Sequence, residues 1–389
     1  MTKLGHIDLD ELSATLMQRG LDGWLIYDFH DSNPVARRVL GGAGMLTRRV
    51  FIWLPAVGPP QAIVSRIDRS AIGDFGGELN PYTTWQELHQ LLTTLVGGRR
   101  VAMEISPQNA VPYLDLVPAG VTELLERLGV TLASSAPLVS QFTSQWTAAE
   151  IEDHRKSAEH LAAIARATLT RVVGQVGEVG EVEVQRGVLE AMARVGLETD
   201  DPPIVAFAAH AADPHYSPTE ATDRTLAAGD VVLLDLWGRF SPDTVWADQT
   251  WMGHAGDAPS AEVVRVWEAV RDARDAVVER LRSAAAAGES LSGADLDNVS
   301  RGLITERGYG DAFTHRTGHS IDLELHGSGP HLDDFETHDV RELLPGVAFS
   351  VEPGVYLTGR FGMRSEINVV MGEDGAEVTP LSPQIDLIV

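Results

Sequence analysis

Carboxylates stand inside the most apolar, strand-like segments of this chain. Asp235 lies in VVLLDLW and Glu352 lies in AFSVEPGVY. Asp248 and Glu366 follow them in the next strand-like segments, VWADQTWMG and SEINVVMG. An ionised carboxylate in a buried strand is costly unless an opposite charge or a metal ion compensates it. We therefore expect the fold to bring a compensating charge to these four acids.

Two explanations for the four acids are open at this point. Each acid taken singly is most simply a strand-end residue that pairs with an arginine or caps a turn. Four carboxylates in one site would instead raise each other's pKa steeply, and two divalent ions would nearly neutralise them. The chain has no cysteine, so carboxylates and imidazoles would have to hold the ions. Such ligands suit Mn, Co or Zn.

Histidines crowd into one segment that also contains glycines. Residues 315–331 (HRTGHSIDLELHGSGPH) hold four of the thirteen histidines, and such crowding is typical of metal or proton chemistry. His315 and His319 have the spacing of a helical zinc pair, but the glycines favour loop and strand over a metalloprotease helix. We expect one histidine to bind metal and others to donate protons; a loop of solvated imidazoles is the alternative. His215, in a proline-containing turn (AADPHYSP), is either solvated or functional.

The charge balance excludes some partners. Acidic residues outnumber basic ones 56 to 30, which gives a formal net charge of -26. Such a chain repels phosphate backbones and anionic membrane surfaces, so we expect neither nucleic acid nor a membrane as a partner. The N-terminus MTKLGHIDLDELSATLMQRG has no apolar signal core, and no apolar run is long enough to span a bilayer. A cytoplasmic location is therefore expected.

The length of 389 residues suggests two domains. In residues 1–140, strand-like segments such as GWLIYDF and RRVAMEIS alternate with helical patterns such as YLDLVPAGVTELLERLG, which predicts an α/β domain. A linker rich in Ser, Thr and Gln follows, SSAPLVSQFTSQW. Thr147 and Glu150 then form a capping box that opens an Ala-rich helix. Residues 141–389 combine long helices with short strands, which predicts an α+β domain.

One pattern occurs twice in the second domain. LAAGDVVLLD ends at Asp235 and LLPGVAFSVE ends at Glu352, and in both a glycine follows a leucine by three residues and precedes the acid by six. Each copy is followed by a second acid on a further strand-like segment. This echo suggests two structurally related halves that each supply a strand pair and two acids.

The segments that carry these residues resemble a known family. Residues 147–389 resemble the pita-bread metallopeptidases (family M24), which include methionine aminopeptidase, aminopeptidase P, prolidase and creatinase. The preceding domain resembles the N-terminal domain of the last three. The resemblance implies an α/β creatinase-like domain followed by an α+β pita-bread catalytic domain with an internal pseudo-two-fold. Its motifs are PHY with His215, LLDLWG with Asp235, ADQTW with Asp248, GHSIDLELH with His319 and His326, FSVEPGVY with Glu352, and MRSEINVV with Glu366.

The resemblance also implies a role for each acid. Asp248 and Glu366 should bridge two divalent metal ions, Asp235 should complete the shell of one ion, and His319 and Glu352 that of the other. Glu352 should further act as the general base toward a metal-bridging water, whose hydroxide attacks the scissile carbonyl.

Other residues are implied to contact the substrate. His215 and His326 should donate hydrogen bonds to the tetrahedral intermediate. His315 matches a substrate-contacting histidine of the aminopeptidase P branch. Candidates for binding the substrate carboxylate are Arg364, Arg341 and His338. The resemblance further implies a homodimer.

The chain departs from the family pattern at several points. The gap between Asp235 and Asp248 is two residues longer than usual, and Asp243 inside it is a rival ligand. Gly327 stands where many relatives have Glu, and RSEIN replaces the more common RIED. These changes bear on substrate specificity more than on metal binding.

The resemblance favours a peptidase that hydrolyses Xaa-Pro bonds in small proline-containing peptides. Proline forms a tertiary amide without an N–H, so recognition as an ordinary extended strand fails and a dedicated site makes physical sense. A Xaa-Pro dipeptidase is the first hypothesis, and an aminopeptidase P acting on Xaa-Pro-Yaa peptides is its alternative. A metal-free relative like creatinase and a non-catalytic binding or chaperone relative are the further alternatives.

Overall fold

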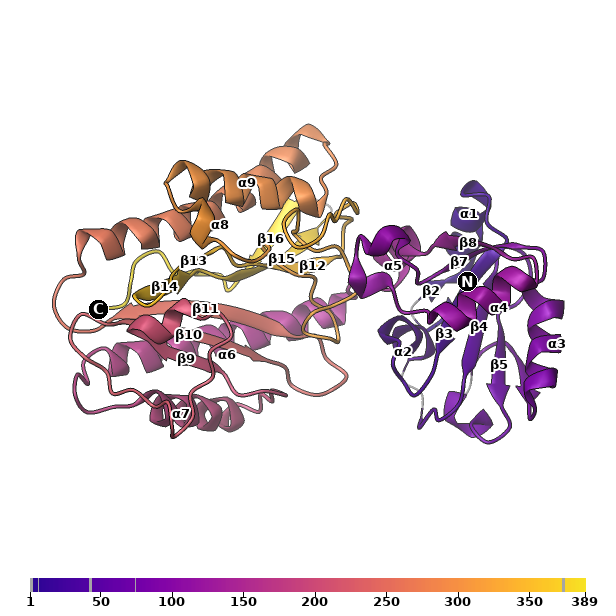
Figure 1. Cartoon of the computed structure of the whole chain (residues 1–389), viewed down its shortest axis with the longest axis horizontal. Helices are drawn as coiled ribbons and strands as arrows, with labels where there is room; N and C mark the ends of the chain where they lie inside the picture. The colour runs from indigo at the N-terminus through magenta and orange to yellow at the C-terminus, as the bar shows by residue number, and fades with distance from the viewer. Residues whose placement is uncertain (1–2, 6, 42–43, 74, 373–374) are drawn as a thin grey trace. The chain divides into compact units, whose positions relative to one another are not determined.

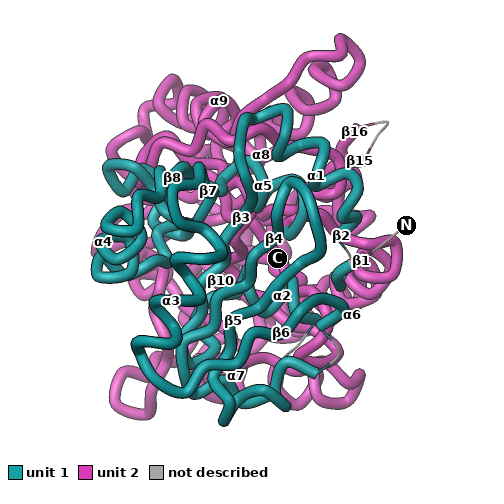
Figure 2. Tube along the Cα trace, turned by 90° about the vertical axis from the view of Figure 1, so that its right-hand side faces the viewer, with its two compact units in different colours: residues 1–143 teal, residues 144–389 magenta. Residues whose placement is uncertain are grey.

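The structure, a computed structural model, describes residues 3–5, 7–41, 44–73, 75–372 and 375–389. The chain separates into two compact units, residues 1–143 and 144–389, which Figure 2 shows in different colours. The sequence placed this boundary between residues 140 and 141. Each unit is described by itself below.

Residues 1–143 are built on a six-stranded sheet with the order β6-β5-β4-β3-β7-β8 (Figure 1). The central strand β3 pairs parallel with β7 and antiparallel with β4. The strands are β3 (Gly23–Asp28), β4 (Val50–Pro55), β5 (Gln61–Ser65), β6 (Glu78–Tyr82), β7 (Arg100–Met103) and β8 (Thr131–Ser134), and a short pair, β1 (Lys3–Leu4) and β2 (Ile7–Asp8), precedes them.

Both faces of this sheet are covered by helices. Successive side chains of β3 point to opposite faces, so Trp24 and Ile26 enter one apolar core and Leu25 and Tyr27 the other. The first core also takes residues from α1 (Leu9–Gln18), α2 (Pro34–Leu40) and α5 (Ala136–Phe142); the second takes residues from α3 (Trp85–Val96) and α4 (Ala119–Arg127). Short 3₁₀ turns are η1 (Arg69–Ile72), η2 (Pro107–Asn109) and η3 (Pro112–Leu114).

Two sequence-based expectations for this region are wrong in detail. The expected linker SSAPLVSQFTSQW contains helix α5, whose Leu138, Val139 and Phe142 are buried in the core. The helical pattern YLDLVPAGVTELLERLG is interrupted, because α4 begins only after Pro118. Proline disfavours the helical conformation of the residue before it and removes a backbone donor, which explains the interruption.

The first half of residues 144–389 packs a helix pair on a three-stranded sheet. It contains α6 (Ala148–Val172), α7 (Glu181–Arg194) and the turn η4 (Ala208–Ala212), and its sheet has the order β11-β10-β9, with β9 (Ile204–Phe207), β10 (Val231–Gly238) and β11 (Ala247–His254). The capping box of Thr147 and Glu150 opens α6, which confirms that prediction. One face of β10, including Val232 and Leu234, packs in the core with α6 and α7.

The second half repeats this plan. It contains α8 (Ala261–Ala287), α9 (Gly293–Glu306) and η5 (Gly310–Ala312), followed by a sheet of order β12-β15-β16 and a hairpin, β13 (Gly354–Leu357) and β14 (Phe361–Arg364). The sheet strands are β12 (Ala348–Val351), β15 (Ile367–Gly372) and β16 (Gly375–Thr379). In Figure 1, α6 and α7 line the lower side of this unit and α8 and α9 its upper side, with the strands between them.

The two halves are related by their order of elements, as the sequence echo predicts. Each begins with a helix pair and continues to a strand that contains or directly precedes an acid, Asp235 within β10 and Glu352 after β12. The glycines at the matching positions of the echo, Gly229 and Gly346, have nearly the same φ, 87° and 89°. Left-handed backbone of this kind favours glycine, and it turns the chain into β10 in one half and β12 in the other.

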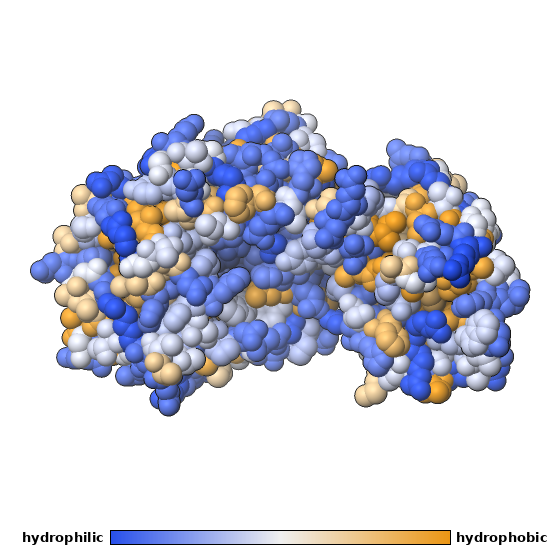
Figure 3. All heavy atoms as spheres, in the orientation of Figure 1, coloured by the Kyte–Doolittle hydropathy of each residue, from blue (hydrophilic) through white to orange (hydrophobic). Residues whose placement is uncertain are grey.

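The outer surface is mostly polar on the face shown in Figure 3. Apolar atoms on this face are gathered in small groups. Among the residues that the structure describes, none of the helices combines the length and the apolar character that crossing a membrane would need.

Candidate metal centre

The first two acids project from the antiparallel pair of β10 and β11. Asp235 lies opposite Thr250, and Asp248 lies opposite Trp237. Residues two apart on a strand share a face, so Asp235 continues the face of Leu233, which points away from the core of α6 and α7. The same alternation puts Asp248 and Thr250 on one face of β11.

The other two acids flank the pair of β12 and β15. Val351 and Ile367 are the last paired residues of this ladder. Glu352 directly follows Val351, and Glu366 directly precedes Ile367. The two carboxylates therefore lie at the same end of the ladder. Pro353 ends β12 at this point, which separates it from β13.

His319 joins the acids from a loop. Isolated bridges on either side of it, from Gly318 to Leu332 and from Ser320 to Phe349, hold the segment extended, which confirms the expected loop and strand. Its Nδ1 lies 3.1 Å from the carbonyl oxygen of Ser320. Since a carbonyl only accepts, Nδ1 carries the hydrogen and Nε2 presents its lone pair.

These residues meet in one buried cluster. Ligand atoms of Asp248, His319 and Glu366 all lie within 4.8 Å of one another. His319 Nε2 is 3.4 Å from Asp248 Oδ2 and 3.4 Å from Glu352 Oε1. Asp248 and Glu366 are only 5% and 4% exposed. The structure therefore brings together carboxylates and an imidazole from both halves.

Asp235 is connected to the cluster through Thr250 and Arg364. The Thr250 hydroxyl lies 3.1 Å from Asp235 Oδ1 and 2.7 Å from Glu366 Oε2. Arg364 donates from Nε to the same hydroxyl at 2.8 Å and forms a buried ion pair with Asp235. The guanidinium thus compensates one of the four acids.

The protonation of three acids reflects their burial. Burial raises the pKa of Asp235 to about 7, against the opposing effect of Arg364. Burial also raises the pKa of Asp248, and burial together with the charge of Asp248 carries the pKa of Glu366 well above its usual range. Without a cation, the cluster therefore retains protons at neutral pH.

The pKa values of two neighbouring groups, Glu352 and His326, are lowered. Burial raises the pKa of Glu352, but electrostatic interactions with His319, His315 and Arg364 outweigh it and lower this pKa to about 2. The electrostatic interaction with His319, together with burial, lowers the pKa of His326 to about 3. Near pH 7, Glu352 is an ionised proton acceptor and His326 is a neutral imidazole with one N–H to donate.

The cluster also passes a direct test for a cation. Asp248 Oδ1 and Glu366 Oε1 are buried, and within the described part of the chain neither oxygen has a hydrogen-bond partner. Buried carboxylate oxygens without partners are costly, and a divalent ion is the natural partner for oxygens beside an imidazole nitrogen. The residues present fit a metal of the type expected from the sequence.

The other expected histidines border this cluster. The rings of His319 and His326 lie 4.2 Å apart between centroids. His215 is exposed, and its electrostatic interaction with His326 contributes to the low pKa of His326. His315 accepts a hydrogen bond at Nε2 from the Tyr356 hydroxyl, 2.8 Å away, because its Nδ1 donates to the carbonyl of Arg316.

Three residues considered from the sequence lie elsewhere. Asp243, the rival of Asp248, is exposed in the connection between β10 and β11. Arg341 is buried, with its guanidinium nitrogens donating to Asp339 and to the carbonyls of Ser328 and Gly329. These bonds occupy Arg341 within its own loop. His338 is mostly exposed and contacts Asp334, with 2.6 Å between Nδ1 and Oδ1.

Sequence reasoning missed some residues of the site. Thr250 links two of the acids, and Ser350 donates to Glu352 Oε1 at 3.0 Å while accepting from the backbone N–H of His319 at 2.9 Å. Tyr356 receives a bond from Arg364 at 3.3 Å in addition to its contact with His315. A signal existed, since Thr250 and Ser350 each stand two residues from a candidate ligand and therefore share its face.

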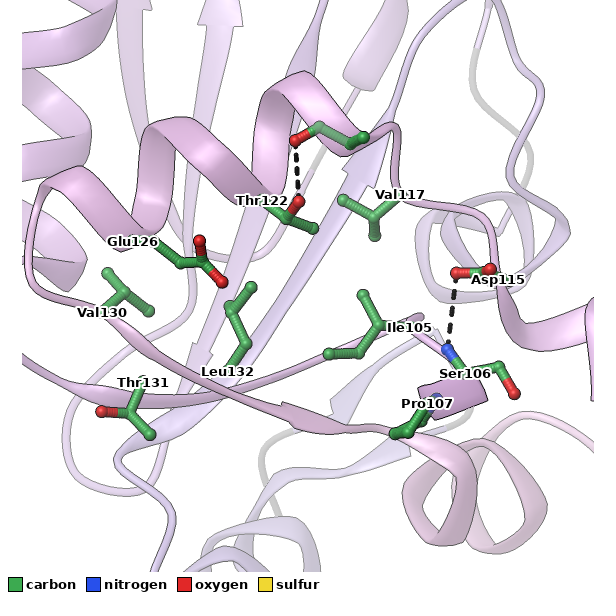
Figure 4. Close-up of a pocket in the computed structure, with 11 residues that line it drawn as sticks. Ile105, Ser106, Pro107, Asp115, Val117, Thr122, Glu126, Val130, Thr131 and Leu132 are labelled. Carbon is green, nitrogen blue, oxygen red and sulfur yellow. Dashed lines mark hydrogen bonds between the residues drawn. The ribbon is translucent and has the colours of Figure 1, made fainter. Parts of the chain in front are cut away.

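A pocket lies in residues 1–143. Figure 4 shows this pocket, of about 710 Å³, between β8 and α4. Its walls are about equally polar and apolar; of its two acids, Asp115 lies in a loop and Glu126 on α4. The Asp115 carboxylate accepts a long bond of 3.4 Å from the backbone of Ser106. This pocket lacks converging titratable groups, so the buried cluster is the better candidate for chemistry.

The family follows from a match that covers the candidate ligands. The model of metallopeptidase family M24 matches residues 153–373. The chain belongs to metallopeptidase family M24. It is therefore a peptidase of a family that uses divalent metals, which agrees with the partnerless oxygens of the cluster.

Individual relatives are similar over nearly the whole chain. A protein named probable dipeptidase PepE from Mycobacterium tuberculosis is 28% identical over 374 residues, which span 94% of this chain and 91% of the relative. The crystal structure of dipeptidase PepE from Mycobacterium ulcerans has a TM-score of 0.77 at 28% identity and covers 97% of this chain and 96% of its own.

A more distant structure supports the fold. The Xaa-Pro dipeptidase from Bacillus anthracis superposes with a TM-score of 0.71 at 23% identity, and the match covers 98% of this M24 chain and 99% of the other. These similarities confirm the predicted architecture, an α/β creatinase-like domain and an α+β pita-bread domain with a pseudo-two-fold.

Proposed function

We propose that this M24 peptidase hydrolyses the bond before proline in small peptides, as a Xaa-Pro dipeptidase. The observation that carries the proposal is the buried meeting of Asp248, His319 and Glu366, with Asp235 and Glu352 beside them. The dipeptidase and Xaa-Pro dipeptidase names of similar proteins support this substrate class. An aminopeptidase P activity on longer peptides is the alternative.

Two divalent ions, Mn, Co or Zn, are proposed as the cofactor. Asp248 and Glu366 would be shared between them, Asp235 would serve one, and His319 and Glu352 the other. Asp248 and Glu366 each have an oxygen without a partner in the described chain, which supports the shared role. When bound, such ions lower the pKa of water and polarise a carbonyl group.

Other side chains accept a proton or donate hydrogen bonds during the reaction. Glu352, whose low pKa keeps it ionised, accepts the proton of the attacking water. Ser350 fixes this carboxylate by donating to Oε1. His326 and His215 donate N–H groups toward the oxygen that becomes negative as the carbonyl turns tetrahedral. The low pKa of His326 keeps it a neutral donor at working pH.

The side chains considered for substrate binding differ in availability. Arg364 is committed to Asp235 and Thr250, and Arg341 is committed to its own loop. His315 is held by Tyr356 at the border of the cluster, where it can position the group before the scissile bond. His338, mostly exposed, remains a candidate for the proline carboxylate. The implied homodimer belongs to the same proposal and is tested by sedimentation.

The proposal is tested with protein purified without chelators. Reconstitution with Mn, Co or Zn should give hydrolysis of a Xaa-Pro dipeptide at a higher kcat/KM than of the matching Xaa-Pro-Yaa tripeptide. Preference for the tripeptide would favour aminopeptidase P. Less than about one bound ion per chain, with no hydrolysis under any metal, would favour a creatinase-like or non-catalytic relative.

A further inference from the structure

A buried acid outside the metal cluster is tied to the loop that carries His215. Glu181 is the first residue of α7, and its side chain is 0% exposed. A carboxylate at this position gains from the partial positive charge of the helix N-terminus. Burial still requires donors for both oxygens, and the loop supplies them.

Three donors to Glu181 come from residues 207–216, the segment that contains His215. The backbone N–H of Phe207 donates to Oε1 at 2.7 Å, and the Tyr216 hydroxyl donates to Oε2 at 2.7 Å. His210 Nδ1 lies 2.9 Å from each oxygen. Phe207 ends β9 and Tyr216 directly follows His215, so one carboxylate closes the loop around the histidine.

The loop between these anchors has a constrained backbone. Ala208 has a φ of 48°, in the left-handed region that is unfavourable for a residue with a side chain. The rings of His210 and Tyr216 stack with 4.4 Å between centroids. Asp213 accepts from the backbone N–H of His215 at 3.1 Å. The backbone of His215 is therefore fixed on both sides, while its imidazole is exposed.

We propose that Glu181 is a positioning residue that acts through Tyr216 to hold the imidazole of His215 toward the reacting carbonyl. This inference rests on the proposed function of His215. In this proposal, Glu181 and Tyr216 contact neither substrate nor metal. They fix the direction in which His215 donates its hydrogen bond. This direction matters most when negative charge develops on the carbonyl oxygen.

The test is a double-mutant cycle of Tyr216→Phe and His215→Ala. Tyr216→Phe removes one donor and keeps the ring, and it should lower kcat about 10-fold with KM and metal content unchanged. In the His215→Ala background the same change should have no further effect, because the histidine it positions is gone. Tyr82→Phe is the control, since that hydroxyl also donates a hydrogen bond, to the Arg49 carbonyl 2.9 Å away, but lies within residues 1–143.

Each contrary result has a distinct meaning. If His215→Ala lowers kcat and Tyr216→Phe does not, the positioning role is overturned while the proposed function stands. If Tyr216→Phe lowers kcat equally in both backgrounds, Tyr216 acts independently of His215 and the inference is wrong. If His215→Ala leaves kcat unchanged, the role of His215 itself fails together with the inference. Glu181→Gln should reproduce the kcat loss, and a normal kcat in folded Glu181→Gln would also overturn the proposal.

Discussion

In the first half of the M24 unit, the buried carboxylate of Glu181 holds the loop of His215 through hydrogen bonds from Phe207, His210 and Tyr216. In the second half, a buried carboxylate on α9, Asp297, binds the segment that carries His319. It accepts from the backbone and the hydroxyl of Thr317, at 2.9 and 2.7 Å, two residues before His319.

The two carboxylates differ in how their charge is compensated. Asp297 forms a two-point ion pair with Arg301, with distances of 2.9 and 3.0 Å. Arg301 in turn donates to the carbonyls of Phe313 and His315. A bidentate arginine adds strength and fixed geometry. The half that supplies the candidate imidazole ligand is therefore held by a charge pair, and the half that supplies His215 by hydrogen bonds.

The acids of the two halves also differ in the direction of their pKa shifts. Both acids of the first half, Asp235 and Asp248, have raised pKa values. In the second half Glu366 is raised and Glu352 is lowered, because histidines of its own half lie beside Glu352. The asymmetry leaves one ionised proton acceptor in a cluster that otherwise requires a cation.

The largest expected effect comes from removing the first half's shared carboxylate. Asp248→Ala should abolish bound metal and lower kcat/KM by at least about 1,000-fold while the chain stays folded. Metal content, peptide hydrolysis and circular dichroism measure the three parts. Asp243→Ala removes an exposed aspartate from the preceding connection and is the matched control. Near-normal turnover in Asp248→Ala would show that the first half supplies no shared ligand.

The second prediction compares the two carboxylates that hold the loops. Asp297→Asn leaves Arg301, 18% exposed, without its charge partner, and should lower the free energy of unfolding by about 2–3 kcal/mol. Glu181→Gln keeps an acceptor and should cost about 1 kcal/mol. Urea denaturation of metal-free protein measures both. Equal losses would remove the distinction drawn between the charge pair and the hydrogen-bonded loop.

The candidate ligands emerge from the sequence more readily than the groups that hold them. Asp235, Asp248, Glu352 and Glu366 stand in or beside apolar strands, where an acid is conspicuous. Glu181 begins a helix, where acids are common for electrostatic reasons alone, and its donors lie 26 to 35 residues along the chain. No local pattern connects such distant partners.

The parts of the fold that the sequence predicts also depend on local signals. Alternation and capping predicted the strands and α6, because those signals are local. The sequence predicts a linker where α5 lies, because the surrounding Ser, Thr and Gln residues resemble a loop, whereas burial of the apolar side chains of α5 decides the outcome. The length and charge of the chain do not report such tertiary contacts.

The third prediction uses the protonation difference between the halves. A carboxyl whose pKa is raised in the folded state binds more protons folded than unfolded, so stability falls as pH rises. For Asp235 the window runs from about pH 4, the unfolded pKa, to about pH 7, the folded one. Each carboxyl that stays protonated on folding contributes up to about 1.4 kcal/mol per pH unit.

Denaturation midpoints of chelator-treated protein between pH 5 and 7 measure this slope. Histidines with lowered pKa values, such as His326, oppose this slope up to about pH 6.5, so the contribution of Asp235 is measured as the difference in stability between wild type and Asp235→Asn. In metal-free protein this difference should fall as pH rises, and saturating Mn should flatten it, because the ion replaces the proton. A metal-free difference that rises with pH would contradict the raised pKa of Asp235.

The smallest predicted effect tests the pseudo-two-fold itself. Gly229 and Gly346 have the same left-handed backbone, so alanine at either position should cost about 1 kcal/mol of unfolding free energy. A Cβ on Gly229 would meet no atom within 4 Å, whereas one on Gly346 would lie 3.1 Å from Gln145 Cβ. Gly346→Ala should therefore lose about 1 kcal/mol more, the cost of displacing Gln145. A smaller loss at Gly346 than at Gly229 would contradict the close contact with Gln145. No loss at Gly229 would show that the left-handed turn places no constraint there, and the equivalence of the halves would then rest on element order alone.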